Sequence, residues 1–109
     1  VSIASEKKED GTTERVPIRL VQAKEKAKSP RPVMIVLHGT GGNKEQMQSW
    51  LDEFASLGFV AVAIDARYHG ARVPEAKGSS AYVAAITKAW QTPAGKPMEH
   101  PFFYDTVWD

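Results

Sequence analysis

The chain has 109 residues, carries 14 lysines and arginines against 13 aspartates and glutamates, and has a formal net charge of +1. It contains no cysteine, which excludes a disulfide framework, a zinc–thiolate site and a thiol nucleophile among these residues. The near-neutral charge gives no support for a nucleic-acid or acidic-membrane partner, the apolar runs are too short to span a bilayer, and the length predicts one domain or part of one.

A β-hairpin is predicted at the N-terminal end, over residues 1–22. Asp10-Gly11 is a hairpin turn signal that would join residues 1–5 to residues 13–22. The second of these segments has apolar residues at alternate positions, which predicts a strand with one buried face. Pro17 lacks a ladder donor, which places this strand near a sheet edge or at a bulge. Residues 24–32 are predicted to be a solvated connector.

Residues 33–64 are predicted to form a strand, a helix and a second strand. Residues 33–37 and 59–64 are apolar on both faces, as strands inside a parallel sheet are. Asn43 and Gln46 form a capping-box pattern at the start of the helix, and Gly58 stands where a left-handed residue ends it. The apolar residues of the helix recur at helical spacing as one stripe: Met47, Trp50, Leu51, Phe54 and Leu57. This βαβ unit should have a right-handed crossover.

The pattern is looser after the second strand. Residues 66–77 are predicted to be a loop at the C-terminal edge of the sheet, and Ser79 or Ser80 would cap a helix that runs to Trp90. The apolar stripe of this helix would consist of Tyr82, Val83, Ile86 and Trp90. Residues 92–101 read as a loop, and residues 102–109 as the start of a further helix that has no stop signal. We therefore expect residues 1–109 to be a single partial domain of a longer protein.

The sequence His-Gly-Thr-Gly-Gly at residues 38–42 lies between a buried strand and a helix N-terminus. Ligands of open α/β sheets bind at the carboxyl ends of the strands, where glycines let backbone N–H groups approach and the helix dipole favours negative charge. The loop therefore suits an anion or a developing oxyanion. A Walker A motif is absent, and a dinucleotide fingerprint would need glycine where Lys44 stands. The alternative is a glycine turn that only reverses the chain.

The sequence Asp-Ala-Arg-Tyr-His-Gly at residues 65–70 follows the second buried strand. Asp65 could accept backbone N–H bonds or pair with Arg67 or Arg72, and a structural ion pair is the favoured role. His69 could be a general base, but the sequence shows no partner that would orient it, so a structural or substrate-loop role is favoured. His38 is expected to form a local hydrogen bond that shapes its own loop.

The third histidine and the aromatic residues give weaker indications of a functional site. His100 is expected to face solvent, and three scattered histidines without carboxylates at ligand spacing make a poor metal site, so no metal is expected. The aromatic side chains could line a pocket, although core packing is the favoured role: Tyr68, Tyr82, Trp90, Phe102, Phe103 and Trp108.

The order and spacing of these motifs resemble the α/β-hydrolase superfamily over residues 13–109. The segments that carry the resemblance are His38-Gly39-Thr40-Gly41-Gly42 after a strand, Leu57-Gly58-Phe59 at a helix end, and Asp65-Ala66-Arg67-Tyr68-His69-Gly70 after the next strand. The continuation Gly70-Ala71-Arg72 looks most like the branch that contains dienelactone hydrolases, acetyl esterases and prolyl-peptidase-like enzymes. Together the motifs point to the superfamily and not to one substrate.

The resemblance implies an oxyanion hole in the loop after the third strand. In that family this loop donates one of the backbone N–H groups of the hole; by resemblance Thr40 is the best match and Gly41 the next. The residues that the resemblance places at the binding site are His38, Gly39, Gly42, Tyr68 and His69, the two glycines allowing a close approach.

The chain departs from the family at the nucleophile. No Gly-x-Ser-x-Gly elbow is present, and the serines fall in or beside predicted helices: Ser49, Ser56, Ser79 and Ser80. The expected fold is therefore the N-terminal portion of an α/β-hydrolase, in which an antiparallel hairpin leads into a parallel βαβ sheet that stops before the nucleophile strand. Residues 33–37 would then present an apolar edge to the missing part of the domain or to another chain.

The function implied by this resemblance is that of a serine esterase, which acts on a small-molecule ester through an acyl-enzyme and needs no cofactor. Its triad would lie outside these residues, so the 109-residue chain alone is expected to be inactive. Two alternatives stay open: a non-catalytic ligand-binding protein of the same fold, and a fragment that acts only with a partner chain. The cellular compartment also stays open.

Overall fold

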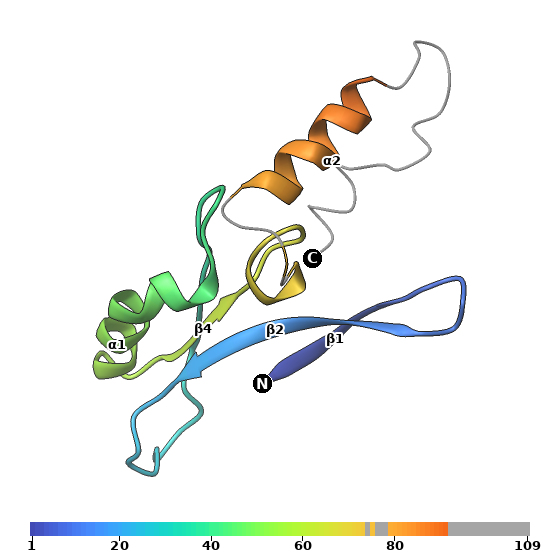
Figure 1. Ribbon diagram of the computed structural model, residues 1–109. Helices are drawn as coiled ribbons and strands as arrows, with labels where there is room; N and C mark the ends of the chain where they lie inside the picture. The colour runs from blue at the N-terminus through green and yellow to red at the C-terminus, as the bar shows by residue number, and fades with distance from the viewer. Residues whose placement is uncertain (74, 76–78, 92–109) are drawn as a thin grey trace.

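The computed structural model describes residues 1–73, 75 and 79–91, which form a mixed four-stranded sheet with two α-helices (Figure 1). The strands are β1 (Ser2–Lys7), β2 (Thr13–Val21), β3 (Val33–Val36) and β4 (Val60–Ile64), and the helices are α1 (Gln48–Ser56) and α2 (Ser80–Trp90). Two 3₁₀ turns, η1 (Lys44–Met47) and η2 (Gly70–Arg72), complete the described elements. The expected α/β class is confirmed. The predictions for residues 92–109, including His100, Phe102, Phe103 and Trp108, lie outside the described residues.

The strand order in the sheet is β1-β2-β4-β3. β1 and β2 form the expected antiparallel hairpin around Asp10 and Gly11, and Gly11 adopts a φ of +84° in its turn. β3 and β4 pair in parallel, with α1 between them in the sequence, as predicted for the βαβ unit. β2 and β4 pair antiparallel and join the hairpin to that unit.

Pro17 stands where β2 changes its partner. The part of β2 before Ile18 pairs with β1, and the part from Ile18 to Val21 pairs with β4. The carbonyl of Pro17 accepts a hydrogen bond from Asp65 N (3.1 Å), and Ile18 N donates to Val1 O (2.9 Å). A residue without an N–H fits such a crossing point, since one ladder ends there and the other begins. The register shift in this hairpin lies in β1, between Ala4 and Lys7, rather than at Pro17.

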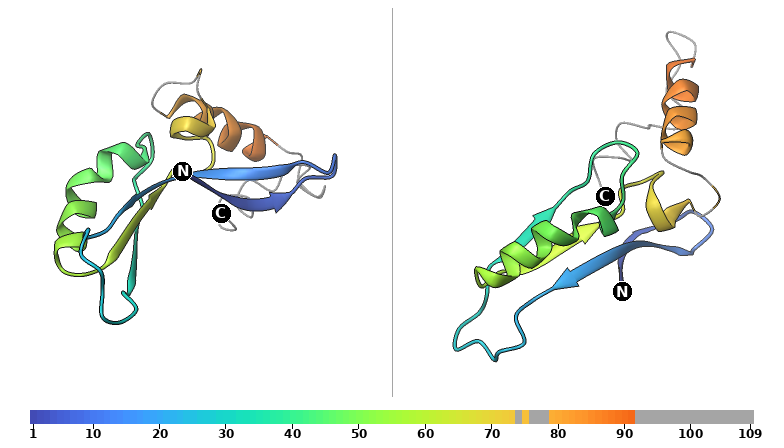
Figure 2. Two further views of the ribbon diagram at one scale, coloured as in Figure 1. Left: turned by 90° about the horizontal axis from the view of Figure 1, so that it is seen from below. Right: turned by 60° about the vertical axis from the view of Figure 1, so that its left-hand side comes forward.

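The core lies between α1 and one face of the sheet (Figure 2). Its fully buried members are Leu51 of α1 and the two alanines of β4, Ala61 and Ala63. Small side chains on β4 let the helix approach the sheet closely. Of the predicted α1 stripe, Trp50 is 53% exposed and Leu57 is also exposed, so the buried stripe is narrower than its apolar residues predict.

The helix ends follow the sequence signals only in part. Asn43 caps η1, its side chain accepting from Gln46 N at 3.1 Å, and Gly58 takes a left-handed φ of +95° after α1. Ser79, one of the two predicted capping residues, stands at the N-cap position of α2, but its side chain makes no capping hydrogen bond. Within α2, Trp90 and Val83 are exposed, whereas the buried residue is Ala89.

Where β2, β4 and β3 pair with one another, the other face of the sheet carries branched aliphatic side chains. By the pairing register these are Ile18, Leu20, Val33, Ile35, Val60, Val62 and Ile64. Val33 is 61% and Ile35 62% exposed, and β3 is the last strand on its side of the described sheet. β3 therefore presents the expected open apolar edge. No described helix is both long and apolar enough to cross a membrane.

Candidate functional site

Two loops meet at one edge of the sheet, at the carboxyl ends of β3 and β4. Because these strands are parallel, the segment that follows β3 (residues 37–43) and the segment that follows β4 (residues 65–72) emerge side by side. We call them the first loop and the second loop. The first loop leads into η1 and α1, and the second loop contains η2. This edge is where the sequence predicted the site.

Asp65, at the start of the second loop, is the centre of the contacts between the two segments. Its side chain is fully buried, with 0% exposure. One carboxylate oxygen accepts from Lys44 N (2.9 Å), and the other accepts from Lys44 Nζ (2.6 Å) and from Ala71 N (3.0 Å). Lys44 N–H lies at the start of η1, so the protein's own carboxylate already occupies the position that the helix dipole favours for an anion.

Asp65 and Lys44 each stabilise the charged form of the other. Burial alone would raise the pKa of Asp65, but the hydrogen bonds from Lys44 and Ala71 and the Lys44 charge outweigh it and hold that pKa below its ordinary value. Burial alone would lower the pKa of Lys44, but Asp65 and the neighbouring Glu45 raise it. Asp65 therefore stays an anion and Lys44 a cation, and the ion pair joins the second loop to the start of η1, directly after the first loop.

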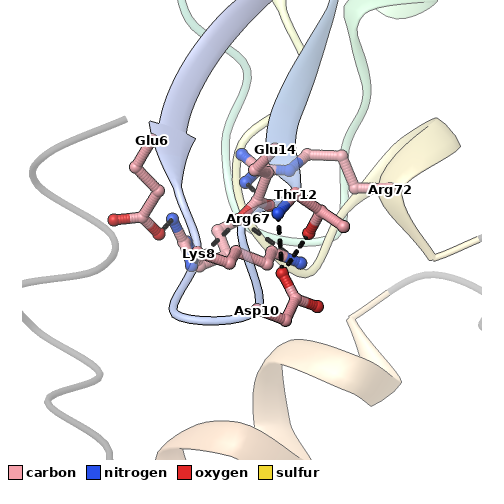
Figure 3. A network of polar contacts seen from close by, with 7 residues as sticks. All are labelled: Glu6, Lys8, Asp10, Thr12, Glu14, Arg67 and Arg72. Atoms are coloured by element: carbon pink, nitrogen blue, oxygen red, sulfur yellow. Dashed lines mark hydrogen bonds and ion pairs between the residues drawn. The ribbon is translucent and has the colours of Figure 1, made fainter.

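The partner of Asp65 corrects the expectation from the sequence. Arg67 and Arg72 do not pair with the Asp65 carboxylate; Arg72 Nη1 donates to the backbone carbonyl of Asp65, at 3.5 Å. Both arginines turn instead toward the hairpin, where they share the carboxylate of Glu14 on β2, and Arg67 Nη2 also pairs with Glu6 at 2.9 Å (Figure 3). Burial would raise the pKa of Glu14, but the Arg72 hydrogen bond and the nearby cations lower it. This network fastens the second loop to the hairpin.

Gly70 is required by the position of Asp65. Its φ is +53°, and a Cβ atom there would lie less than 3.0 Å from the Asp65 carboxylate carbon and both its oxygens. Tyr68, two residues earlier, has a φ of +66°, an uncommon conformation for a residue other than glycine. The second loop therefore folds tightly around the buried carboxylate, and any side chain at Gly70 would push that carboxylate out of place.

His38 and His69 exchange hydrogen bonds between the loops. His38 Nε2, in the first loop, accepts from Ala66 N of the second loop at 3.1 Å. His69 Nε2, in the second loop, accepts from Gly41 N of the first loop at 3.0 Å. Their ring centroids lie 5.1 Å apart. Each loop therefore contributes one imidazole acceptor and one backbone donor.

These contacts determine the tautomer of both rings. A nitrogen that accepts from a backbone N–H carries no hydrogen, so both Nε2 atoms are unprotonated. The remaining hydrogen sits on Nδ1, which faces a carbonyl oxygen in each case: Gly39 O for His38 (2.8 Å) and Arg67 O for His69 (2.9 Å). Both rings are neutral and both use each ring nitrogen within the chain. Each of the four ring nitrogens therefore already has a hydrogen-bond partner within the chain.

Among the three consecutive N–H groups from Thr40 to Gly42, the one of Thr40 is available. Gly41 N–H is committed to His69 and Gly42 N–H donates to Gly39 O at 2.9 Å, whereas Thr40 N–H makes no hydrogen bond in the described part of the chain. Thr40 is exposed. A Cβ at Gly42 would lie 2.8 Å from the Gln46 Oε1 atom, so glycine is needed there, while a Cβ at Gly39 would meet nothing within 4 Å.

The aromatic residue that approaches the site is Tyr82 of α2, whose ring centroid lies 5.3 Å from that of His69. Tyr68 is half-buried, and Trp90 is exposed, so the aromatic residues neither form one core cluster nor line one cavity in the described residues. The described residues also contain no group of three or more histidine, aspartate or glutamate side chains that could hold a metal ion.

Lys44 is the site residue that the sequence did not single out for this role. Its only local signal is its place directly after the helix cap Asn43, which puts its N–H at the helix start. Comparison of the chain with family models, with curated proteins and with solved structures finds no match.

Proposed function

We propose that the chain supplies the oxyanion loop of a serine hydrolase that cleaves a carboxylic ester through an acyl-enzyme. The observation that carries the proposal is the N–H of Thr40, which is exposed at the carboxyl end of β3 and makes no hydrogen bond within the described residues, whereas the next two donors, Gly41 and Gly42, are occupied. α/β-Hydrolases take one oxyanion donor from the segment between the third strand and the first helix, which is the position of this loop.

The rigidity of the loop supports this role. An oxyanion donor accelerates acyl transfer because it already points at the developing charge and needs no reorganisation during the reaction. The first loop is held from both ends: His38 and Gly41 bind the second loop, and Lys44 binds the buried Asp65. Thr40 lies between these fixed points. Gly41 N–H, the other candidate donor, would have to leave His69 before it could serve.

The nucleophile and the base belong to residues outside this chain under this proposal. Ser49 and Ser56 lie on α1, and Ser79 and Ser80 lie at the start of α2, so no described serine follows a strand at a sharp turn into a helix. Both described histidines use their ring nitrogens internally. The reaction requires no cofactor, because a serine nucleophile, a base and two N–H donors are sufficient for acyl transfer.

The test uses the complete natural polypeptide that contains these residues. A fluorophosphonate should label one serine outside residues 1–109, and the protein should hydrolyse p-nitrophenyl acetate. Thr40→Pro, which removes the N–H, should lower kcat by about 100-fold or more. Thr40→Ala keeps the N–H and is the matched control, with kcat close to that of the parent. The 109-residue chain alone should show no hydrolysis above a heat-denatured sample.

Two results would contradict the proposal. A complete polypeptide that folds, binds small esters and is not labelled would be a non-catalytic ligand-binding protein of this class. Equal loss of activity in Thr40→Pro and Thr40→Ala, with unchanged melting temperatures, would show that the threonine side chain matters and the backbone donor does not.

A second candidate role is favoured by the open edge of the sheet. Val33 and Ile35 are more than half exposed on β3, and Leu37 directly after it is 66% exposed. Such an edge pairs readily with another strand, from the rest of the same domain or from a partner chain. We propose that the chain functions only when this edge is covered, which size measurements in solution can test.

A further inference from the structure

We propose that His38 and His69 are positioning residues that hold the first loop, and with it Thr40 N–H, only while both imidazole rings are neutral. The proposal rests on the proposed function in one respect, namely that Thr40 N–H is the donor that matters. The connection between the loops itself is independent of any activity.

The physical basis is the direction of the two hydrogen bonds. Each Nε2 accepts from a backbone N–H of the opposite loop, at 3.0 Å for Gly41 and 3.1 Å for Ala66. A protonated imidazole carries hydrogen on both nitrogens. Nε2 could then no longer accept, and its own N–H would point at the backbone N–H of the opposite loop. Protonation therefore breaks the bond between the loops, whereas the Nδ1 bonds to Gly39 O and Arg67 O can persist.

The described residues around His69 and His38 offer no negative charge that would compensate an imidazolium. His69 is 3% exposed, and its ring contacts in the described part of the chain are with the His38 ring at 5.1 Å and the Tyr82 ring at 5.3 Å. Two cationic rings at that separation repel each other. Asp65 carries the buried carboxylate of the described residues, and its oxygens already accept from Lys44 and Ala71.

The arginines of the second loop do not offset the charge either, because Arg67 and Arg72 are themselves cations that pair with glutamates of the hairpin. Histidine is the side chain whose ordinary charge change falls between about pH 5 and pH 8. Acidification that protonates the two rings should therefore separate the first loop from the second at Gly41 and Ala66, while the Lys44–Asp65 ion pair keeps the start of η1 in place. The result is local release of the loop that carries Thr40.

The first test is spectroscopic and uses the wild-type chain. Ring nitrogen chemical shifts from ¹⁵N-labelled histidine should show the Nδ1–H tautomer for both His38 and His69 at neutral pH. On acidification the amide resonances of Gly41 and Ala66 should shift together with the ring signals. An Nε2–H tautomer at either ring, or amides that do not follow ring protonation, would overturn the proposal.

The second test uses variants that separate acceptance from titration. In His69→Gln the amide oxygen can accept from Gly41 N–H but does not titrate, whereas His69→Leu cannot accept. At neutral pH, exchange of the Gly41 amide hydrogen should be about five- to ten-fold faster in His69→Leu than in wild type, the factor expected for one lost hydrogen bond. In His69→Gln it should stay slow, and its protection relative to the intrinsic exchange rate should not change on acidification. His38→Gln should have the same effect on Ala66 and leave Gly41 unchanged.

The outcomes separate this inference from the proposed function. If the amides follow the rings but the complete polypeptide has no esterase activity, the connection stands and the esterase proposal fails. If activity is present and Gly41 exchange is the same in wild type, His69→Gln and His69→Leu, the positioning role is refuted and the esterase proposal stands. Should a variant fail to fold, the ring tautomers of the wild-type chain still decide the question.

Discussion

Lys44 and Asp65 are 21 residues apart in the sequence, and Lys44 Nζ lies 2.6 Å from a carboxylate oxygen of Asp65 that is fully buried. The same carboxylate accepts the backbone N–H of Lys44 at 2.9 Å. Lys44, in the first helical turn, thus donates two hydrogen bonds to the buried carboxylate, one from its backbone N–H and one from its side chain. The ion pair connects the start of η1 to the second loop and holds the candidate site together.

Removal of the cation should therefore be costly. Lys44→Met leaves Asp65 buried with only backbone donors, and the unfolding free energy should fall by about 3–5 kcal/mol. Lys28→Met, in the exposed connector, is the matched control and should change it by less than about 0.5 kcal/mol. Urea denaturation followed by circular dichroism measures both. If Lys44→Met proves as mild as the control, the pair is not what holds the two loops.

Gly70→Ala should destabilise the protein more than the same change at Gly58. Both residues have positive φ values, so each alanine carries backbone strain of about 1 kcal/mol. At Gly58 the new Cβ meets nothing within 4 Å, whereas at Gly70 it meets the Asp65 carboxylate. Overpacking adds about 1–3 kcal/mol at Gly70. Melting temperatures of the two variants should differ accordingly, and equal losses would mean that the carboxylate moves aside freely.

Stability should fall steeply in acid. The pKa values of Asp65 and Glu14 are lowered in the folded protein, so each carboxylate stabilises the fold above its unfolded pKa of about 4, and this contribution is lost as pH falls through the folded value. Unfolding free energies measured from neutral pH downward should decline most below about pH 4. Glu14→Gln should have a shallower slope there. An unchanged slope would remove Glu14 from the acid response.

The open edge of β3 should promote association. Ile35 is 62% exposed in the terminal strand of the described sheet, so Ile35→Lys should disfavour strand pairing between chains at little cost to the fold. Light scattering after size exclusion should show the 109-residue chain as larger than a monomer and Ile35→Lys as smaller. Val83→Lys, on an exposed position of α2, is the control. A wild-type chain that melts cooperatively as a monomer would contradict the expectation.

The local elements could be predicted because their signals lie within a few residues of each other. The Asp10-Gly11 turn, the apolar runs of β3 and β4, the Asn43 cap and the left-handed Gly58 all appear where the pattern placed them. A cap also depends on geometry: Ser79 stands at the right place before α2, yet its side chain makes no capping bond. A serine before a helix favours a capping hydrogen bond, but the backbone angles at that residue decide whether the bond forms.

The amino-acid order alone determined the α/β class, the element order and the loop that carries Thr40, because periodicity and turn chemistry are local properties. Only the tertiary structure decided the partners within the site. Asp65 pairs with Lys44 rather than with the nearer Arg67, and Gly41 donates to His69. These pairs form because the parallel strands bring the two loops together. Their members are 21 residues apart (Lys44 and Asp65) and 28 residues apart (Gly41 and His69) in the sequence, so a pattern of a few neighbouring residues cannot predict them.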